Sequence, residues 1–135
     1  MKKVYISLGS NLENPKQQLQ TAISHIINIP ETTWIAQSPV LQTAPIGPQD
    51  QPDFYNQIVV VETTLSPQAL LYALQAIENT MGRVRTQHWG PRVIDCDILL
   101  FGDDVIQTDA LIIPHPEINN RPFVQQLLRE VNCVS

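Results

Sequence analysis

The stretch WGPRVIDCDILLFGDDVI, Trp89 to Ile106, has the apolar composition of a strand inside a sheet, yet it carries Asp95 and Asp97 one residue apart. Successive side chains of a strand alternate between its faces, so both carboxylates point the same way, about 7 Å apart along the chain. The other face carries Ile94, Cys96 and Ile98. Like charges this close repel each other unless a cation lies between them. The stretch predicts a strand whose polar face is either simply solvated or a site for a cation.

Three arginines flank this strand in the segment RVRTQHWGPR: Arg83, Arg85 and Arg92. Guanidinium groups and carboxylates together are expected around a magnesium polyphosphate, because magnesium takes hard oxygen ligands and keeps waters and phosphates in its shell. Direct salt bridges between the arginines and the aspartates are the competing interpretation. We favour the magnesium site because the arginines lie on a predicted loop, where they can close over a ligand.

Length and composition limit the class of protein. A chain of 135 residues with 43% hydrophobic residues is expected to form one domain over residues 1–135. With 8 Lys and Arg against 13 Asp and Glu, the net charge of −5 argues against an overall surface for nucleic acid or an anionic membrane. Cys96 and Cys133 have no metal-ligand spacing, and the N-terminus resembles neither a signal peptide nor a membrane span. We therefore expect a soluble cytoplasmic protein with reduced cysteines.

The predicted elements alternate between strands and helices. In the first half of the chain, we expect a strand over KVYISLGSN, a helix from Lys16 to Ile29, a strand over TTWIAQSPVLQT interrupted by Pro39, and a long loop over APIGPQDQPDF. A strand over YNQIVVVETTL then leads to a helix that is capped by Ser66 and runs through Met81. After the aspartate strand, we expect a hairpin over FGDDVIQTDALIIPH added to the sheet and a helix over NNRPFVQQLLREV. This order matches an α+β fold, the ferredoxin-like βαββαβ sandwich with an added hairpin and C-terminal helix. Such a fold does not determine a function.

Aromatic residues lie beside polar, proline-rich segments. Trp89 either pins its loop to the core or stacks on a flat heterocycle, and Phe54 and Phe123 are placed similarly. Asn56 can donate and accept at once, as recognition of a ring amide edge requires. Together these residues indicate a planar, hydrogen-bonding substrate held between aromatic rings. By itself, the position of His115 between prolines favours a buried imidazole whose hydrogen bonds are satisfied over a ligand-binding group.

The chain resembles the 6-hydroxymethyl-7,8-dihydropterin pyrophosphokinase family, also called 2-amino-4-hydroxy-6-hydroxymethyldihydropteridine diphosphokinase. The resemblance is carried by the segments YISLGSNLENP, TAPIGPQDQPDFYNQIVVVET, GRVRTQHWGPRVIDCDILLFGDDVI and IIPHPEINNRPFV. It implies an ATP-dependent transferase of folate biosynthesis that moves the pyrophosphoryl group of ATP onto the pterin hydroxymethyl group and releases AMP. It also implies a monomer that acts on small molecules with two magnesium ions.

The resemblance implies roles for matching positions. Asp95 and Asp97 would hold the magnesium ions and form the catalytic group with Arg83 and Arg92. The pterin pocket would be lined by Thr43, Pro45, Phe54, Asn56, Trp89 and Phe123. The nucleotide would be bound by Gln75, Glu78, Arg83, Arg85, Arg92, Ile98, His115 and Arg121.

Some positions depart from the family pattern, and two other functions remain open. The loop before Trp89 is a residue short, Ala110 and Ile112 stand where a basic residue and a hydroxyl often occur, and the tail ends early. One alternative is a two-metal phosphodiesterase acting on nucleic acid, which paired aspartates would suit but the acidic charge opposes. The other is a non-catalytic pterin- or nucleotide-binding module.

Overall fold

A computed structural model describes residues 1–12, 14–44, 52–82 and 93–134. Its main sheet is built around β1 (Lys2–Ser10), which pairs with β4 (Phe54–Thr63) on one side and β5 (Asp95–Phe101) on the other. β2 (Thr32–Gln37) and the short β3 (Leu41–Thr43) both pair with β4. The order is β2-β4-β1-β5 and every pairing is antiparallel. β1 and β4 are therefore central strands.

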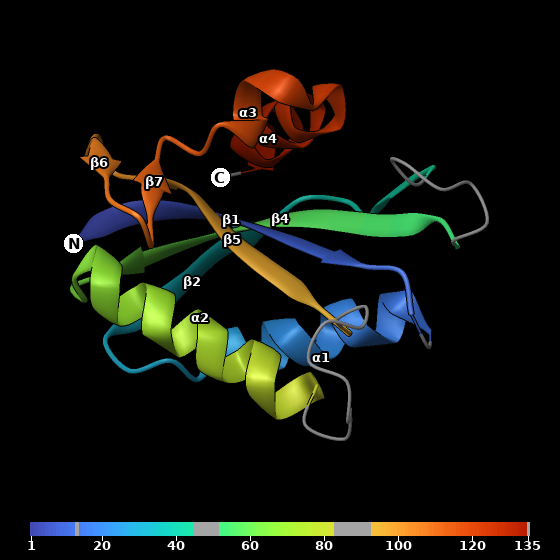
Figure 1. The fold of residues 1–135 in the computed structure, drawn as a ribbon, viewed down its shortest axis with the longest axis horizontal. Coiled ribbons are helices and arrows are strands. Elements are labelled where there is room, and N and C mark those ends of the chain that lie inside the picture. The colour runs from blue at the N-terminus through green and yellow to red at the C-terminus, as the bar shows by residue number, and fades with distance from the viewer. Residues whose placement is uncertain (13, 45–51, 83–92, 135) are drawn as a thin grey trace.

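Helices cover both faces of this sheet (Figure 1). On one face lie α1 (Pro15–Ile27) and α2 (Pro67–Gly82), and on the other lies α4 (Pro122–Val134). Side chains of β4 alternate between two hydrophobic cores: Val59 and Val61 pack with α1 and α2, whereas Ile58 and Val60 pack with α4. Residues Ile58 to Val61 are all fully buried, so β4 is covered on both faces.

The two predicted long helices are confirmed, with small shifts at their ends. α1 begins at Pro15, one residue before the predicted Lys16, and ends at Ile27. α2 begins at Pro67, and the hydroxyl of Ser66 accepts a hydrogen bond from the N–H of Ala69 at 3.1 Å, as an N-cap should. The predicted interruption at Pro39 separates β2 from β3, and the N–H of Ser38 there donates to the carbonyl of Ile58.

The predicted hairpin forms, but it is not part of the main sheet. β6 (Ile106–Gln107) and β7 (Ile112–Ile113) pair with each other as a separate two-stranded sheet. The hairpin is held beside β5 by the burial of Leu111 and Ile113 in the core and by the N–H of His115, which donates to the carbonyl of Leu99 at 3.0 Å. Strands of two residues are too short to extend the ladder of β5.

The predicted C-terminal helix is in fact two helices. α3 (Glu117–Asn120) is followed by Arg121, whose backbone is extended (φ −124°, ψ 110°), and α4 starts at Pro122. The residue before a proline is driven out of the helical region by clash with the proline ring, and proline is favoured at a first helical position. Because its backbone is extended, Arg121 projects its side chain in another direction than it would within a continuous helix.

These elements confirm a mixed α and β fold built on an antiparallel sheet, with four helices among the described residues. No described helix is both long and apolar enough to cross a membrane.

The cap of α2 gives a test of the fold. We expect Ser66→Ala to lower the free energy of unfolding by about 1 kcal/mol, because the N–H of Ala69 loses its acceptor. Ser24→Ala is the matched control, since Ser24 lies within α1 and its hydroxyl donates to the carbonyl of Gln20 on an exposed surface. Urea denaturation of both variants measures the difference. Equal effects would contradict the assignment of Ser66 as the cap.

Candidate functional site

The register of β1 brings polar residues of β4 and β5 to one face of the sheet. Gly9 lies opposite Asn56 on one side and opposite Asp95 on the other. Ser7 lies opposite Asp97. Cys96, between the aspartates, packs in the core with α1 and α2. The prediction that Asp95 and Asp97 share one face, opposite an apolar face, is therefore confirmed.

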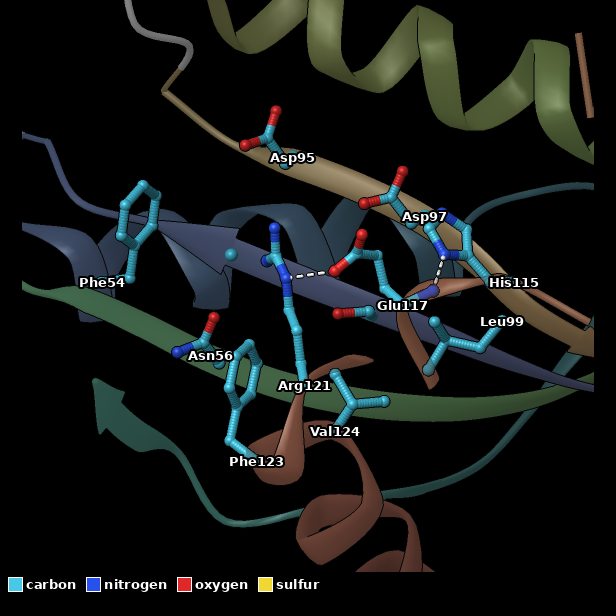
Figure 2. Close-up of a pocket in the computed structure, with 12 residues that line it drawn as sticks. Phe54, Asn56, Asp95, Asp97, Leu99, His115, Glu117, Arg121, Phe123 and Val124 are labelled. Atoms are coloured by element: carbon cyan, nitrogen blue, oxygen red, sulfur yellow. Dashed lines mark hydrogen bonds and ion pairs between the residues drawn. The ribbon is translucent and has the colours of Figure 1, made fainter. Parts of the chain in front are cut away.

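A cavity of about 100 Å³ opens on this polar face (Figure 2). Figure 2 shows the aspartates along β5, Phe54 and Asn56 on β4, and the side chains of the α3–α4 segment facing them. The lining residues are Ser7, Gly9, Phe54, Asn56, Asp95, Asp97, Leu99, His115, Glu117, Arg121, Phe123 and Val124. Residues far apart in sequence thus meet at one site.

Two further cavities adjoin the first. One of about 190 Å³ shares Phe54, Asn56, Asp95, Arg121 and Phe123 with it and adds Thr43 and Ala44. The other, of about 220 Å³, shares Asp97 and His115 with it and extends along β5 to the hairpin. Asp95 therefore lines the central cavity and the cavity of about 190 Å³, and Asp97 lines the central cavity and the cavity of about 220 Å³. The two carboxylates lie where an aromatic compartment and a strand-edge compartment meet.

The central cavity has an excess of negative charge among its described residues. Asp95, Asp97 and Glu117 contribute three carboxylates against the one guanidinium of Arg121, whose Nε donates to Glu117. Asp95 is half-buried and Asp97 is exposed. The described residues contain no group of three or more side chains suited to hold a metal ion. A cation held by these two aspartates would complete its shell with waters or phosphate oxygens, which is the coordination that magnesium prefers.

Asn56 is buried, with 6% of its surface exposed, and its amide nitrogen is already engaged. This nitrogen donates to the carbonyl of Leu41 at 3.2 Å and to the hydroxyl of Thr43 at 2.8 Å. Both N–H groups are used in holding β3 against β4, so the amide offers a ligand only its oxygen. The expectation that Asn56 donates and accepts at once is therefore wrong: it can accept from a ligand N–H but has no hydrogen left to donate.

Arg121 and Phe123 stand beside each other at the start of α4. The guanidinium carbon lies 5.9 Å from the centre of the Phe123 ring, and its Nε is paired with the carboxylate of Glu117. Phe54 lines the same cavity from β4, as Thr43 does from the end of β3. The structure thus brings together four of the residues expected to contact a planar substrate: Thr43, Phe54, Asn56 and Phe123.

His115 is half-buried and lines two of the cavities. Its Nδ1 accepts a hydrogen bond from the backbone N–H of Glu117 at 3.1 Å. In the neutral ring this assigns the proton to Nε2, which is then a donor. A fully buried core imidazole, the alternative left open by the sequence, is not what the structure has.

Two of the remaining residues expected to bind the nucleotide, Glu78 and Ile98, lie along the outer edge of β5. Glu78 on α2 accepts the N–H of Cys96 at 2.8 Å, so the predicted carboxylate binds the strand itself. The side chain of Ile98 is buried, so only its backbone can contact a ligand. Backbone N–H groups along a strand point alternately to its two edges, so the N–H of Ile98 points to the same edge as the N–H of Cys96. Gln75 is exposed on α2 and does not line the three cavities. Ala110 and Ile112 line the strand-edge cavity.

Several predicted residues lie outside the described part of the chain. These are Pro45, Arg83, Arg85, Trp89 and Arg92. Their roles stay predictions.

Five residues that line the central cavity were not among the predicted site residues, and two of them had a signal in the sequence: these five are Ser7, Gly9, Leu99, Glu117 and Val124. Gly9 lies in the middle of the polar face, and an isolated glycine in a strand pattern is a known signal for close approach of another group. Glu117 pairs with Arg121 four residues later, and this helical spacing was the available signal.

Comparisons with known sequences point to one family. A family model described as 7,8-dihydro-6-hydroxymethylpterin-pyrophosphokinase (HPPK) matches residues 5–133. The 2-amino-4-hydroxy-6-hydroxymethyldihydropteridine pyrophosphokinase of Haemophilus influenzae is 47% identical over 127 residues, which cover 94% of this chain and 79% of that protein. The protein of the same name from Pseudomonas aeruginosa is 46% identical over 124 residues, covering 92% of this chain and 76% of its own.

Solved structures agree on the fold. The structure of Plasmodium falciparum HPPK-DHPS matches with a TM-score of 0.75 at 16% identity and covers 96% of this chain. This chain covers 40% of that longer chain. A second structure, of HPPK-DHPS in complex with substrates, matches with a TM-score of 0.72 at 14% identity, covering 96% of this chain and 42% of the other. At such identities the likeness concerns the fold alone.

The hydrogen bonds of Asn56 give a test of the site's construction. We expect Asn56→Asp to lower the free energy of unfolding by roughly 3 kcal/mol, because a carboxylate cannot donate to Leu41 and Thr43 and is buried near Asp95. Asn132→Asp is the control: its carbonyl oxygen accepts from the hydroxyl of Tyr5 at 2.6 Å, and aspartate keeps that acceptor. The control should stay within about 1 kcal/mol of the parent in urea denaturation. Similar losses in both variants would contradict the assigned amide orientation.

Proposed function

The chain belongs to the 7,8-dihydro-6-hydroxymethylpterin-pyrophosphokinase family, and we propose that the three adjoining cavities around Asp95 and Asp97 are its active site. The enzyme is an ATP-dependent diphosphokinase of folate synthesis, which transfers the pyrophosphoryl group of ATP to 6-hydroxymethyl-7,8-dihydropterin. One observation carries the location: the aspartates line the junction between an aromatic compartment and a compartment along a strand edge.

The reaction needs two substrates to meet at one phosphorus atom. The hydroxymethyl oxygen of the pterin loses its proton to solvent and forms a bond to the β-phosphorus of ATP, the bond from that phosphorus to the α,β-bridging oxygen breaks, and AMP leaves with that oxygen. No covalent enzyme intermediate is required, so catalysis depends on positioning and on neutralising the phosphate charge. The proposed site therefore has to hold a flat ring at one end and a nucleotide at the other.

We place the pterin in the compartment between Phe54 and Phe123. Both rings line this cavity of about 190 Å³, and the oxygen of Asn56 is available to accept from an N–H of the ligand. Thr43 supports this geometry because its hydroxyl accepts from Asn56. The pairing of two aromatic walls with one buried acceptor suits a planar heterocycle that carries N–H groups. Pro45 and Trp89 are proposed to complete this pocket on the family resemblance.

We place the nucleotide along the edge of β5, in the cavity of about 220 Å³ that Ile98 and His115 line. β5 is at one end of the main sheet, so part of its backbone is free of strand partners and can bind a base as another strand would. His115 can donate through Nε2, and Arg121 brings a guanidinium to the central cavity. Glu78 positions the edge by holding Cys96. Gln75, Arg83, Arg85 and Arg92 are further proposed nucleotide contacts, with Arg83 and Arg92 in catalytic roles.

We propose Asp95 and Asp97 as ligands of two magnesium ions. Their same-face placement and the excess of carboxylates around them support a cation there. When bound, the ions would neutralise the phosphate oxygens of ATP and polarise the substrate hydroxyl. Through these ions, the two carboxylates would hold the polyphosphate at the junction of the two compartments.

We also propose that residues 1–135 act as a single domain, as a monomer, in the cytoplasm. The family resemblance supports the monomeric state. The order β5-β1-β4-β2, with helices between its strands, supports the ferredoxin-like arrangement as the finer description of the fold.

The decisive experiment is a product assay. The purified protein is incubated with ATP, magnesium and 6-hydroxymethyl-7,8-dihydropterin, and the nucleotide products are separated. We expect AMP and the pterin diphosphate in equal amounts, because the β- and γ-phosphates move together. Release of ADP would reject pyrophosphoryl transfer. Binding of both substrates with no product would favour a non-catalytic module.

Asp97 distinguishes a metal ligand from a structural ion pair. We expect Asp97→Asn to lower turnover at least about a hundredfold while the ligand-free protein stays as stable or gains roughly 0.5 kcal/mol, because a repulsive carboxylate is removed. Magnesium ATP at a hundred times its dissociation constant should stabilise the parent by about 2.7 kcal/mol and the variant much less. Thermal and urea denaturation with and without the ligand measure both effects.

Asp103→Asn is the matched control, since Asp103 is an exposed aspartate in the turn after β5. It should keep the turnover, the stability and the response to magnesium ATP of the parent. An Asp97→Asn variant that is less stable, keeps its turnover per folded molecule and responds fully to magnesium ATP would overturn the metal assignment.

A further inference from the structure

Glu117 contacts two residues of the proposed nucleotide site at once. Its backbone N–H donates to Nδ1 of His115, and its carboxylate pairs with Nε of Arg121. It is the first residue of α3, between the strand edge that holds His115 and the start of α4. Figure 2 shows both interactions as dashed lines beside Asp97.

The contact with His115 fixes the orientation of the imidazole. The backbone of His115 is held to β5, because its N–H donates to the carbonyl of Leu99 at 3.0 Å. The N–H of Glu117 then occupies Nδ1, so the ring can neither turn freely nor carry its neutral proton on that nitrogen. Nε2 is left as the donor on the cavity side. One backbone group of Glu117 thus sets which atom of His115 a ligand meets.

The contact with Arg121 fixes the guanidinium. Arginine has many rotamers, and Arg121 has an exposed side chain (43%) that would otherwise sample them. Pairing at Nε and contact with the Phe123 ring hold it from two sides and leave its terminal nitrogens to face the cavity. A guanidinium that is already ordered loses less conformational freedom when it binds a phosphate.

Charge alone argues for the opposite effect. Glu117 adds a third carboxylate to a cavity that already contains Asp95 and Asp97, and it neutralises the guanidinium that a phosphate would bind. If only net charge mattered, removing this carboxylate would strengthen the binding of ATP. A positioning role predicts weaker binding. The two explanations therefore differ in the sign of the effect.

We propose that Glu117 is a positioning residue, which orders Arg121 through its carboxylate and His115 through its backbone so that both face the phosphates of ATP. This role rests on the proposed function. It acts through two other side chains, so Glu117 need not touch the nucleotide.

The test is a double-mutant cycle on the binding of a non-hydrolysable ATP analogue with magnesium, measured by calorimetry. Glu117→Ala should weaken binding about three- to tenfold, as expected for the loss of a charge-assisted contact that orders its partner. In the Arg121→Ala background the same change should have little further effect, because its partner is already absent. The conservative Glu117→Asp should recover part of the loss.

An ion pair that lines none of the three cavities supplies the control. Lys2 Nζ and Asp104 Oδ1 are 2.7 Å apart, and their side chains are exposed to a similar degree as those of Arg121 and Glu117. Asp104→Ala should leave the affinity for the analogue unchanged. Nuclear magnetic resonance of the ligand-free protein adds a direct readout: the Nε–H of Arg121 should exchange with solvent more slowly in the parent than in Glu117→Ala.

The outcomes separate this role from the proposed function. A parent that releases no AMP in the product assay rejects the function and this role with it. A parent that releases AMP, together with a Glu117→Ala variant that binds the analogue equally or more tightly, rejects this role alone. Equal exchange of the Arg121 Nε–H in parent and variant also overturns it.

Discussion

The register of β1 is the constraint on which the rest of the structure depends. Alternate side chains of this strand, Val4, Ile6 and Leu8, are fully buried against α1 and α2. Full burial of such a side chain stabilises the fold by about 1.5–3 kcal/mol, and a slip of one residue would move all three out of this core to the opposite face of the sheet. The same register places Gly9 between Asn56 and Asp95 on the opposite face. Hydrophobic burial on one face thus determines which polar groups meet on the other.

The glycine in this register leaves room for the site. A β-carbon at Gly9 would lie 3.5 Å from the side-chain oxygen of Asn56, an ordinary contact distance. The backbone there tolerates a side chain, but any larger group would extend into the cavity that Gly9 lines. The absence of a side chain at this position is therefore explained better by the space above the sheet than by the conformation of the strand.

Features set by neighbours along the chain could be predicted from the sequence. The two-residue period of a strand places Asp95 and Asp97 on one face, and the serine before Pro67 identifies the start of α2. The break at Arg121 was missed although its signal is local: the apolar spacing of a helix continues across Pro122 and outweighed the restriction that proline imposes.

Features set by distant partners could not be predicted. The amide of Asn56 is oriented by Leu41 and Thr43, which reach it only because β3 pairs with β4. The residue type shows that an asparagine side chain can donate and accept hydrogen bonds. It does not show which of its atoms are already bonded within the fold. Likewise, the alternation of the strand places Ile98 on the apolar face, but the sequence does not show that β5 lies at the end of the sheet, with the backbone of Ile98 at its edge.

The negative charge of the chain and of the central cavity affects which form of ATP can bind. A net charge of −5 and the carboxylates of the central cavity repel a free polyphosphate, so the proposed site does not attract ATP by its overall field. A nucleotide that arrives with magnesium carries less negative charge, and under the proposed function it would meet ligands for the metal at Asp95 and Asp97. Under the proposed function, the same carboxylates that disfavour the bare nucleotide favour its magnesium complex. The preference for the magnesium complex over the bare nucleotide then follows from β5 alone. This strand presents both carboxylates on one face, and its other face packs in the core.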